Sequence, residues 1–142
     1  MSLCKASVAH ASVMAYMHQL CFDDGWNEKA FYDLLALPTT IGWIDENSFI
    51  LCSHVLDEME ILTICTIPEK RRMGYGKTLL NTLDDYAKKH MIKRIFLEVR
   101  SNNLPAKSLY ETNGFNQTGI RKGYYKTADG MIDAVCMTKV IG

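Results

Sequence analysis

The sequence lacks any pattern of paired cysteines. Its five cysteines lie far apart with no C-x-x-C pair, and an odd number cannot all form disulfides within one chain: Cys4, Cys21, Cys52, Cys65 and Cys136. Scattered cysteines of this kind favour a reducing, intracellular compartment. The N-terminus has no secretory signal pattern, and no apolar run approaches the ~20 residues that cross a bilayer. We therefore expect a cytoplasmic protein that does not contact a membrane.

An excess of charge of either sign is also missing. Sixteen Lys and Arg side chains balance sixteen Asp and Glu, so the formal net charge is zero. Nothing in this balance steers the protein toward nucleic acid or an anionic membrane. The chain contains no internal repeat, low-complexity tract or linker-like stretch. With 142 residues, 48% of them hydrophobic, residues 1–142 are expected to form a single domain.

Four segments have the pattern of helices. The first ends near Cys21, and the spacing of its apolar residues predicts a buried face made of Val13, Tyr16, Met17 and Leu20. Asn27 is the predicted N-cap of the second, which turns Phe31 inward and ends before Pro38. The third runs from Gly76 to about His90. Asn102 or Asn103 caps the fourth, which ends at Asn113-Gly114.

Six runs have the pattern of strands: 41–44, 49–56, 59–67, 95–99, 115–122 and 131–140. Polar residues 45–48 and the pair Asp129-Gly130 suit hairpin turns. Helices and strands alternate through the middle of the chain, and hairpin-like strands lie at both ends. The pattern predicts an α/β fold with a sheet of mixed direction and helices covering its faces.

The strongest chemical signal is the basic, glycine-containing segment 71–77, which follows a strand and opens a helix. Glycines let the backbone approach an anion, and the first amides of a helix have no partner within it. Two nucleotide-binding patterns fail here, because a P-loop needs glycine where Arg71 stands and a dinucleotide fingerprint needs glycine at Leu79. Two interpretations of this segment stay open: a phosphate-binding loop, or a turn with a solvated basic face.

A second ordered motif lies downstream, L-E-V-R-x-x-N at residues 97–103 followed by A-x-x-L-Y-E-x-x-G-F at residues 106–115. Together with R-x-x-G-x-G at residues 71–76, it resembles the GNAT acetyltransferase superfamily, most closely the RimI-type ribosomal-protein-alanine N-acetyltransferases. The resemblance covers residues 59–140 well and the first 58 residues only loosely. It implies a GNAT fold, whose mixed, mostly antiparallel sheet has a V-shaped splay, with acetyl-CoA as co-substrate and no metal.

The same resemblance implies which residues bind acetyl-CoA. Main-chain amides of the glycine loop would hold the pyrophosphate, and the preceding strand would offer main-chain groups to the acetyl-pantetheine arm. Asn103 would add a side-chain contact, although a helix N-cap explains it equally well. The expected set is Ile64, Cys65, Thr66, Arg71, Arg72, Met73, Gly74, Tyr75, Gly76, Lys77 and Asn103.

Acetyl transfer to an amine needs a proton acceptor for the amine and a proton donor for the departing thiolate. Glu98 lies inside an otherwise apolar strand, where a carboxylate is costly unless it is solvated, paired or used. We assign it the role of general base, with a solvated edge glutamate as the alternative. By resemblance Tyr110 is the general acid, since a phenol stays protonated at neutral pH; its alternative is an aromatic packed in the core.

Other groups carry weaker signals. Four scattered histidines do not form a metal site, and a buried free thiol explains Cys65 better than a nucleophile does. The acidic residues Asp57, Glu58 and Glu60 could attract a cationic amine, but a solvated strand end explains them better. The basic stretch 121–126 resembles a nucleic-acid-stacking surface, and the family context makes it a wall of the substrate groove instead.

Three functions stay open on this basis. The resemblance favours transfer of acetyl to a protein N-terminus, most specifically the N-terminal alanine of a ribosomal protein, with no direct contact to nucleic acid. The same machinery could acetylate a small amine. A non-catalytic acyl-CoA-binding module is the third, and the presence of both Glu98 and Tyr110 argues against it. We expect a monomer or a weak dimer.

Overall fold

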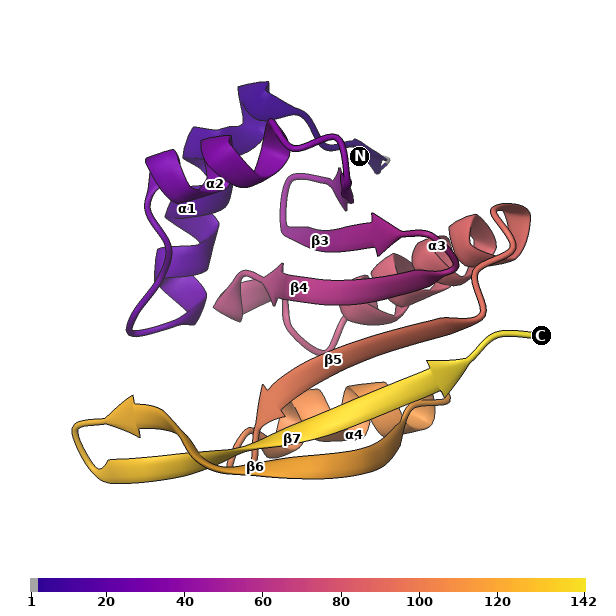
Figure 1. Ribbon diagram of the computed structural model, residues 1–142. Coiled ribbons are helices and arrows are strands. Elements are labelled where there is room, and N and C mark those ends of the chain that lie inside the picture. The colour runs from indigo at the N-terminus through magenta and orange to yellow at the C-terminus, as the bar shows by residue number, and fades with distance from the viewer. Residues whose placement is uncertain (1–2) are drawn as a thin grey trace.

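The computed structural model describes residues 3–142 as one seven-stranded sheet flanked by helices (Figure 1). The helices are α1 (Ala11–Cys21), α2 (Glu28–Leu35), α3 (Tyr75–Lys89) and α4 (Leu104–Thr112), with 3-10 turns η1 (Val8–His10) and η2 (Pro68–Lys70). The strands are β1 (Cys4–Lys5), β2 (Thr40–Ile44), β3 (Ser48–Val55), β4 (Glu58–Thr66), β5 (Arg94–Arg100), β6 (Asn116–Thr127) and β7 (Gly130–Val140). Their spatial order is β1-β2-β3-β4-β5-β7-β6.

The sheet is mixed and mostly antiparallel, as predicted. Every neighbouring pair of strands in residues 3–142 is antiparallel except β4 and β5. These two central strands pair only over residues 58–60 and 94–96, and beyond that point they diverge into a V (Figure 1). On the edges of β4 and β5 that face each other, main-chain groups therefore have no strand partner at residues 61–66 and 97–100. Such groups need other hydrogen-bond partners, so the V is a place where a ligand can bind.

An extra residue in β4 lies where the divergence begins. Leu51 of β3 pairs with Thr63, whereas the next residue, Cys52, pairs with Ile61, so Leu62 has no partner in the ladder. A bulge of this kind bends a strand and increases its twist. The bend carries the second half of β4 away from β5 and opens the V.

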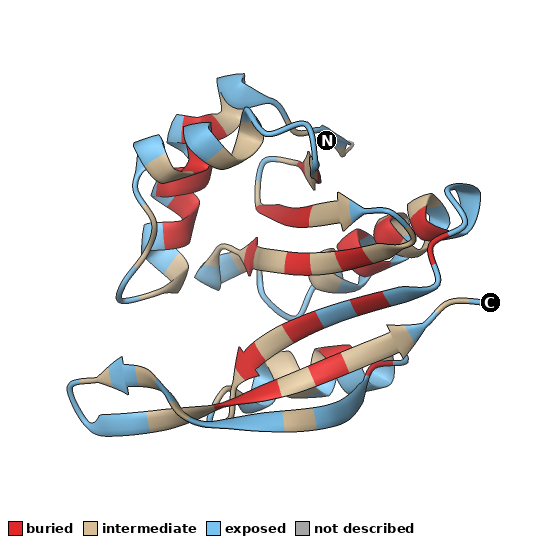
Figure 2. Ribbon diagram, in the orientation of Figure 1, coloured by how far each residue is buried: buried red, intermediate tan, exposed pale blue. Residues whose placement is uncertain are grey.

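Helices cover both faces of the sheet, and each face has its own hydrophobic core. Under α3 and α4 the core includes Leu79, Leu83, Ile95, Leu97 and Tyr110. Under α1 and α2 it includes Met14, Met17, Phe31, Phe49 and Leu51. Figure 2 shows these buried residues as bands along the strands and on the sheet-facing sides of the helices.

The predicted buried face of the first helix was wrong. Val13, Tyr16 and Leu20 are exposed, and α1 instead buries Ala11, Met14, Ala15, Met17 and His18. The two possible faces are adjacent on the helix and share Met17, and both contain apolar residues at helical spacing. The tertiary contact with β3 and β4 selects the face with the smaller side chains and the histidine.

The predicted helix ends were confirmed. The Asn27 side chain accepts a hydrogen bond from the Ala30 N–H at 2.9 Å, and the Asn103 side chain accepts one from the Ala106 N–H at 3.3 Å. Asn103 rather than Asn102 is thus the N-cap of α4. Gly114 follows that helix with φ 94°, a left-handed conformation that glycine adopts at little cost. The strand predicted at 115–122 extends further, to Thr127.

Candidate active site

The chain passes from β4 to α3 through an exposed basic loop at the open end of the V. The first main-chain hydrogen bond of α3 joins the Thr78 N–H to the Gly74 carbonyl at 3.0 Å. The amides of Tyr75, Gly76 and Lys77 precede that bond and have no acceptor within the helix. Arg71, Arg72, Met73, Gly74 and Lys77 are all exposed. This helix start is open to an anion, and its dipole and neighbouring cations favour one.

The backbone of this loop needs glycine at one position for conformation and at another for packing. Gly74 has φ 87°, in the left-handed region, and a Cβ there would meet no other atom within 4 Å. A Cβ on Gly76 would lie 2.9 Å from Cδ2 of Leu109, so Gly76 allows α3 to approach α4. Arg72 also has a positive φ, 65°. Alternation into left-handed conformations turns successive amides toward one side, as in anion-binding nests.

We expect Gly74→Ala to weaken binding of acetyl-CoA about tenfold, because an alanine in the left-handed region costs about 1–2 kcal/mol. Isothermal titration calorimetry of the variant and the parent protein measures this change. Gly74→Asn is the matched control, since asparagine tolerates the left-handed region better and should lose less affinity. Equal affinity for the alanine variant and the parent protein would contradict the prediction.

The strand before the loop can offer main-chain rather than side-chain contacts. Ile64 packs against the core under α3, and Cys65 is buried in the core under α1. The Thr66 carbonyl accepts a hydrogen bond from Nε of Arg71 at 3.2 Å, which ties the loop back to β4. The side chains of Ile64 and Cys65 pack into the two cores. These residues can therefore offer a ligand only the main-chain groups on the edge of β4 that faces β5.

Glu98 lies on β5 beyond the point where β4 diverges. Its carboxylate Oε1 is 3.1 Å from Nε of Arg121 on β6, and its side chain is 22% exposed. Strand alternation places Glu98 on the opposite face from Leu97 and Val99, which are buried in the core under α3 and α4. The carboxylate is therefore paired and accessible beside the V.

Glu60 is a second carboxylate at this place, although its sequence context favoured a solvated strand end over a role in attracting an amine. It is opposite Phe96 in the β4–β5 pairing, two residues before Glu98 in register. Burial raises the pKa of Glu60, Glu98 raises it further, and Arg121 opposes the shift. The neighbouring acids Asp57 and Glu58 instead form ion pairs with Lys93 and Arg94. The side chains of Asp57 and Glu58 are 49% and 41% exposed, which agrees with the expectation of a solvated strand end for these two residues.

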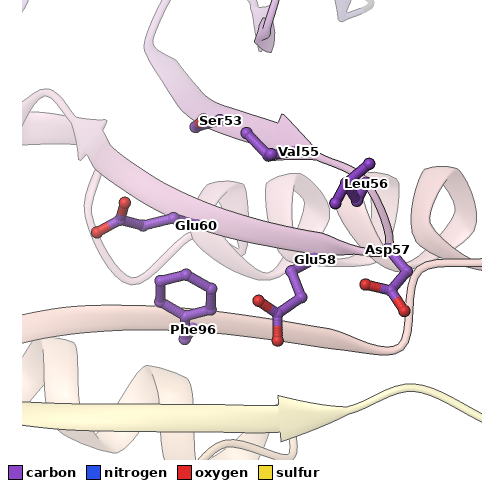
Figure 3. A pocket seen from close by; sticks show the side chains of 7 residues that line it. All are labelled: Ser53, Val55, Leu56, Asp57, Glu58, Glu60 and Phe96. Atoms are coloured by element: carbon purple, nitrogen blue, oxygen red, sulfur yellow. The ribbon is translucent and has the colours of Figure 1, made fainter.

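A shallow hollow of about 190 Å³ lies over the closed end of the V. It is lined by Ser53, Val55, Leu56, Asp57, Glu58, Glu60 and Phe96 (Figure 3). Figure 3 shows the Glu60 side chain directed along β4 away from Asp57, so Glu60 lies at the edge of the hollow nearer the open V. The hollow is thus separate from the basic loop.

Tyr110 is buried on α4, 5% exposed, with its ring edge-on to Phe115 at a centroid distance of 5.7 Å. Burial raises the pKa of Tyr110 well above its usual value, and nearby Cys52 and Tyr125 add to the shift. The hydroxyl therefore stays protonated throughout the neutral range. Tyr110 belongs to the core on one face of β5, whereas Glu98 lies on the other face. The two residues therefore lie on opposite sides of the sheet.

The loop between α1 and α2, residues 22–27, bridges from β4 to β5 at the open end of the V; we call it the strap. Asp24 forms an ion pair with Arg100 of β5 at 3.1 Å, and the Arg100 guanidinium lies 4.9 Å from the centre of the Tyr125 ring. The Arg121 guanidinium lies 5.3 Å from the Tyr124 ring. Strap and β6 residues thus lie around Glu98 on its face, and no local sequence pattern indicated the contribution of the strap.

His18 holds the strap to β4. The Trp26 N–H donates to Nδ1 of His18 at 3.0 Å, so the neutral ring carries its proton on Nε2 and donates it to Oγ1 of Thr63, also at 3.0 Å. The ring is 4% exposed and stacks on Trp26 at a centroid distance of 4.8 Å. Burial lowers the pKa of His18 to about 4 from 6.5, with Asp24 opposing the shift.

This lowered pKa predicts a loss of stability in mild acid. His18 binds a proton near pH 6.5 in the unfolded chain and only near pH 4 in the folded chain. Its contribution to the free energy of unfolding is therefore complete above pH 6.5 and falls as pH drops toward 4. The loss amounts to about 3 kcal/mol. Urea unfolding across this range measures it, with His18→Gln as a non-titrating control that keeps a donor and an acceptor. Parallel curves for the two proteins would contradict the prediction.

Within residues 3–142 no three His, Cys, Asp or Glu side chains are grouped so that they could hold a metal ion. None of the helices in that range has both the length and the apolar character needed to cross a bilayer.

An exposed, basic helix start at the mouth of a split α/β sheet suits a protein that binds an acyl-CoA and transfers its acyl group. A model of the acetyltransferase (GNAT) family matches residues 12–115. The chain belongs to this family and is an acetyl-CoA-dependent N-acetyltransferase.

Several proteins with established names are similar to this chain. The chain is 41% identical over 116 residues to the [ribosomal protein bS18]-alanine N-acetyltransferase of Escherichia coli K12, covering 79% of this chain and 78% of that protein. The crystal structure of the ribosomal-protein-S18-alanine N-acetyltransferase from Escherichia coli superposes with a TM-score of 0.93 at 29% identity, over 99% of this chain and 94% of that one. Arabidopsis thaliana NAA60 in complex with acetyl-CoA shares the fold, with a TM-score of 0.84, 17% identity and coverage of 99% of both chains.

Proposed function

We propose that this protein transfers the acetyl group of acetyl-CoA to the N-terminal α-amino group of a protein, with the N-terminal alanine of ribosomal protein bS18 as the first candidate acceptor. The 41% identity to an enzyme named for that reaction supports the choice of acceptor. The observation that supports the mechanism is that Glu98 and Tyr110 lie on opposite faces of the sheet at β5, one of the two strands that diverge.

The basic loop binds acetyl-CoA in this proposal. The amides from Arg72 to Lys77 hold the pyrophosphate, and Arg71, Arg72 and Lys77 supply positive charge. The free edge of β4 at residues 64–66 accepts and donates main-chain hydrogen bonds to the acetyl-pantetheine arm. Asn103 keeps its structural role as the cap of α4, and a contact between Asn103 and the co-substrate is part of the proposal.

The chemical step uses both faces of the V. The acceptor amine approaches on the Glu98 face and becomes neutral by releasing one proton to water. Its nitrogen then forms a bond with the thioester carbonyl carbon while Glu98 takes a second amine proton, directly or through water. The C–S bond then breaks. Tyr110, on the other face, gives its hydroxyl proton to the departing thiolate. Separation by the sheet lets one residue act on the acceptor and the other on the leaving group without competing for one proton.

A protein acceptor, rather than a small amine, suits the surroundings of Glu98. The strap and the paired tyrosines Tyr124 and Tyr125 make an extended wall, while Glu60 and Glu98 place negative charge where a cationic N-terminus would arrive. We further propose that residues 1–142 act as one GNAT domain in the cytoplasm, as a monomer or weak dimer.

The test is an acceptor panel with acetyl-CoA, followed by thiol release and by mass spectrometry of the products. The panel contains a peptide with the bS18 N-terminus, the same peptide with a blocked N-terminus and an internal lysine, and a polyamine. Acetylation of the free α-amino group alone is the expected result. Labelling confined to the polyamine would favour a small-amine acetyltransferase and would contradict the protein acceptor.

A further inference from the structure

Two thiols from distant parts of the chain meet beside the candidate active site. Cys21 is the last residue of α1 and Cys65 lies in β4, and their Sγ atoms are 2.7 Å apart. Both are free cysteines. A disulfide has an S–S distance of about 2.05 Å, so a small approach of the two sulfurs is enough to form one. The other three cysteines form no such pair within residues 3–142.

The two sulfurs have different surroundings, which suits them to different roles. Cys21 is partly exposed, whereas Cys65 is buried with its Sγ 3.5 Å from the Met17 carbonyl. The hydrogen bond from Cys65 lowers the pKa of the Cys21 thiol, and the guanidinium of Arg71 lowers it further. The same contact and burial raise the pKa of Cys65. Cys21 is thus the accessible thiolate and Cys65 the buried thiol next to it.

We propose that Cys21 and Cys65 form an oxidative modification site that reacts with a peroxide and closes to a disulfide. The Cys21 thiolate attacks a peroxide oxygen, so that an S–O bond forms, the O–O bond breaks and a sulfenic acid remains. The Cys65 sulfur then attacks the Cys21 sulfur. The S–S bond forms as the S–O bond breaks, and the Cys65 proton leaves with the departing hydroxide as water. Two thiols and one hydrogen peroxide give one disulfide and two waters.

The bond would join the end of α1 to β4 immediately before the strap. The strap reaches β5 through the Asp24–Arg100 ion pair, so the disulfide fixes its near end beside the V. The Thr66 carbonyl lies 3.3 Å from Sγ of Cys21 and also accepts the Arg71 side chain. Resting on the proposed function, oxidation is therefore expected to slow turnover of the acceptor peptide, because it would fix the strap next to the face on which the acceptor arrives.

The experiment treats the full-length protein with hydrogen peroxide and maps its peptides without reduction. The expected result is a Cys21–Cys65 linked peptide, a loss of two hydrogens in the intact mass, and a Tm about 5 °C higher that dithiothreitol reverses. Cys21→Ser should abolish the linked peptide and the rise in Tm. Cys136→Ser, which removes a half-buried cysteine outside the pair, should leave both unchanged.

Several outcomes would overturn the proposal. They are a linkage of Cys21 to Cys4 or Cys136, oxidation of Cys21 to a sulfinic acid while Cys65 stays a thiol, or no loss of free thiol in the pair. Because Cys65 is buried, Cys65→Ala could unfold the protein, so Cys21→Ser is the deciding variant and its fold is checked by circular dichroism. Peptide mapping needs no enzymatic activity; a failure of the proposed acceptor reaction would instead appear as absent turnover in the fully reduced protein.

Discussion

Glu98→Gln is expected to lower kcat for acetyl transfer about 100-fold or more while leaving the Kd for acetyl-CoA within about twofold. The amide cannot accept the proton that the amine loses during attack, but it has nearly the same size and keeps an oxygen near Arg121. The basic loop that we propose binds the co-substrate is formed by residues 71–77 and does not include Glu98. Steady-state kinetics with the acceptor peptide and calorimetry with acetyl-CoA measure the two quantities separately.

Arg121→Gln is the matched control for this experiment, because it breaks the 3.1 Å ion pair with Glu98 but keeps the carboxylate. An ion pair this exposed contributes little to stability, so the control protein should fold normally and retain much more activity than Glu98→Gln. If Glu98→Gln turned over the peptide at the parental rate, Glu98 would be a structural partner of Arg121 and not the base.

Tyr110→Phe is expected to lower kcat about 10- to 100-fold, because the variant loses the only proton that Tyr110 offers to the departing thiolate. Phenylalanine keeps the ring and its edge-on contact with Phe115, so the Tm should change little. Burial raises the pKa of Tyr110, so the parental hydroxyl remains protonated in any assay near neutral pH. Thiol release under saturating acetyl-CoA and peptide measures kcat.

Tyr125→Phe provides the comparison for this second experiment. Tyr125 stacks with Arg100 on the acceptor side, so its hydroxyl has no proposed role in protonating the thiolate. Its loss should leave kcat close to the parental value. Equal rates for Tyr110→Phe and the parent protein would exclude Tyr110 as the general acid and leave it as a core aromatic residue.

Much of the secondary structure was predictable because its signals are local. Asn27 and Asn103 cap helices with their own side chains, and Gly114 supplies the left-handed residue that ends α4. The basic loop was also predictable, since a strand, a glycine turn and a helix that follow one another in sequence must place the first amides of the helix at the turn. Interactions between residues a few positions apart do not depend on the rest of the chain.

The buried face of α1 was not predictable in this way. Met14, Met17 and His18 are buried, while Val13, Tyr16 and Leu20, which have the same helical spacing, are exposed. The hydrogen bonds of His18 to Thr63 and Trp26 explain why a histidine belongs on the inner face. They join residues that are up to 45 positions apart, and no periodicity within one helix contains that information.

By itself, then, the sequence determined the four helices and their caps, six of the seven strands within residues 3–142, the basic loop before α3, and Glu98 and Tyr110 as candidates. Only the tertiary structure decided that these two residues face opposite sides of a split sheet, that Glu60 lies beside Glu98, and that Cys21 meets Cys65. The reason is physical. Local elements form from neighbouring residues. Two features depend instead on contacts between distant segments: the packing of α1 on β4, and the divergence of β4 from β5 that the bulge at Leu62 causes.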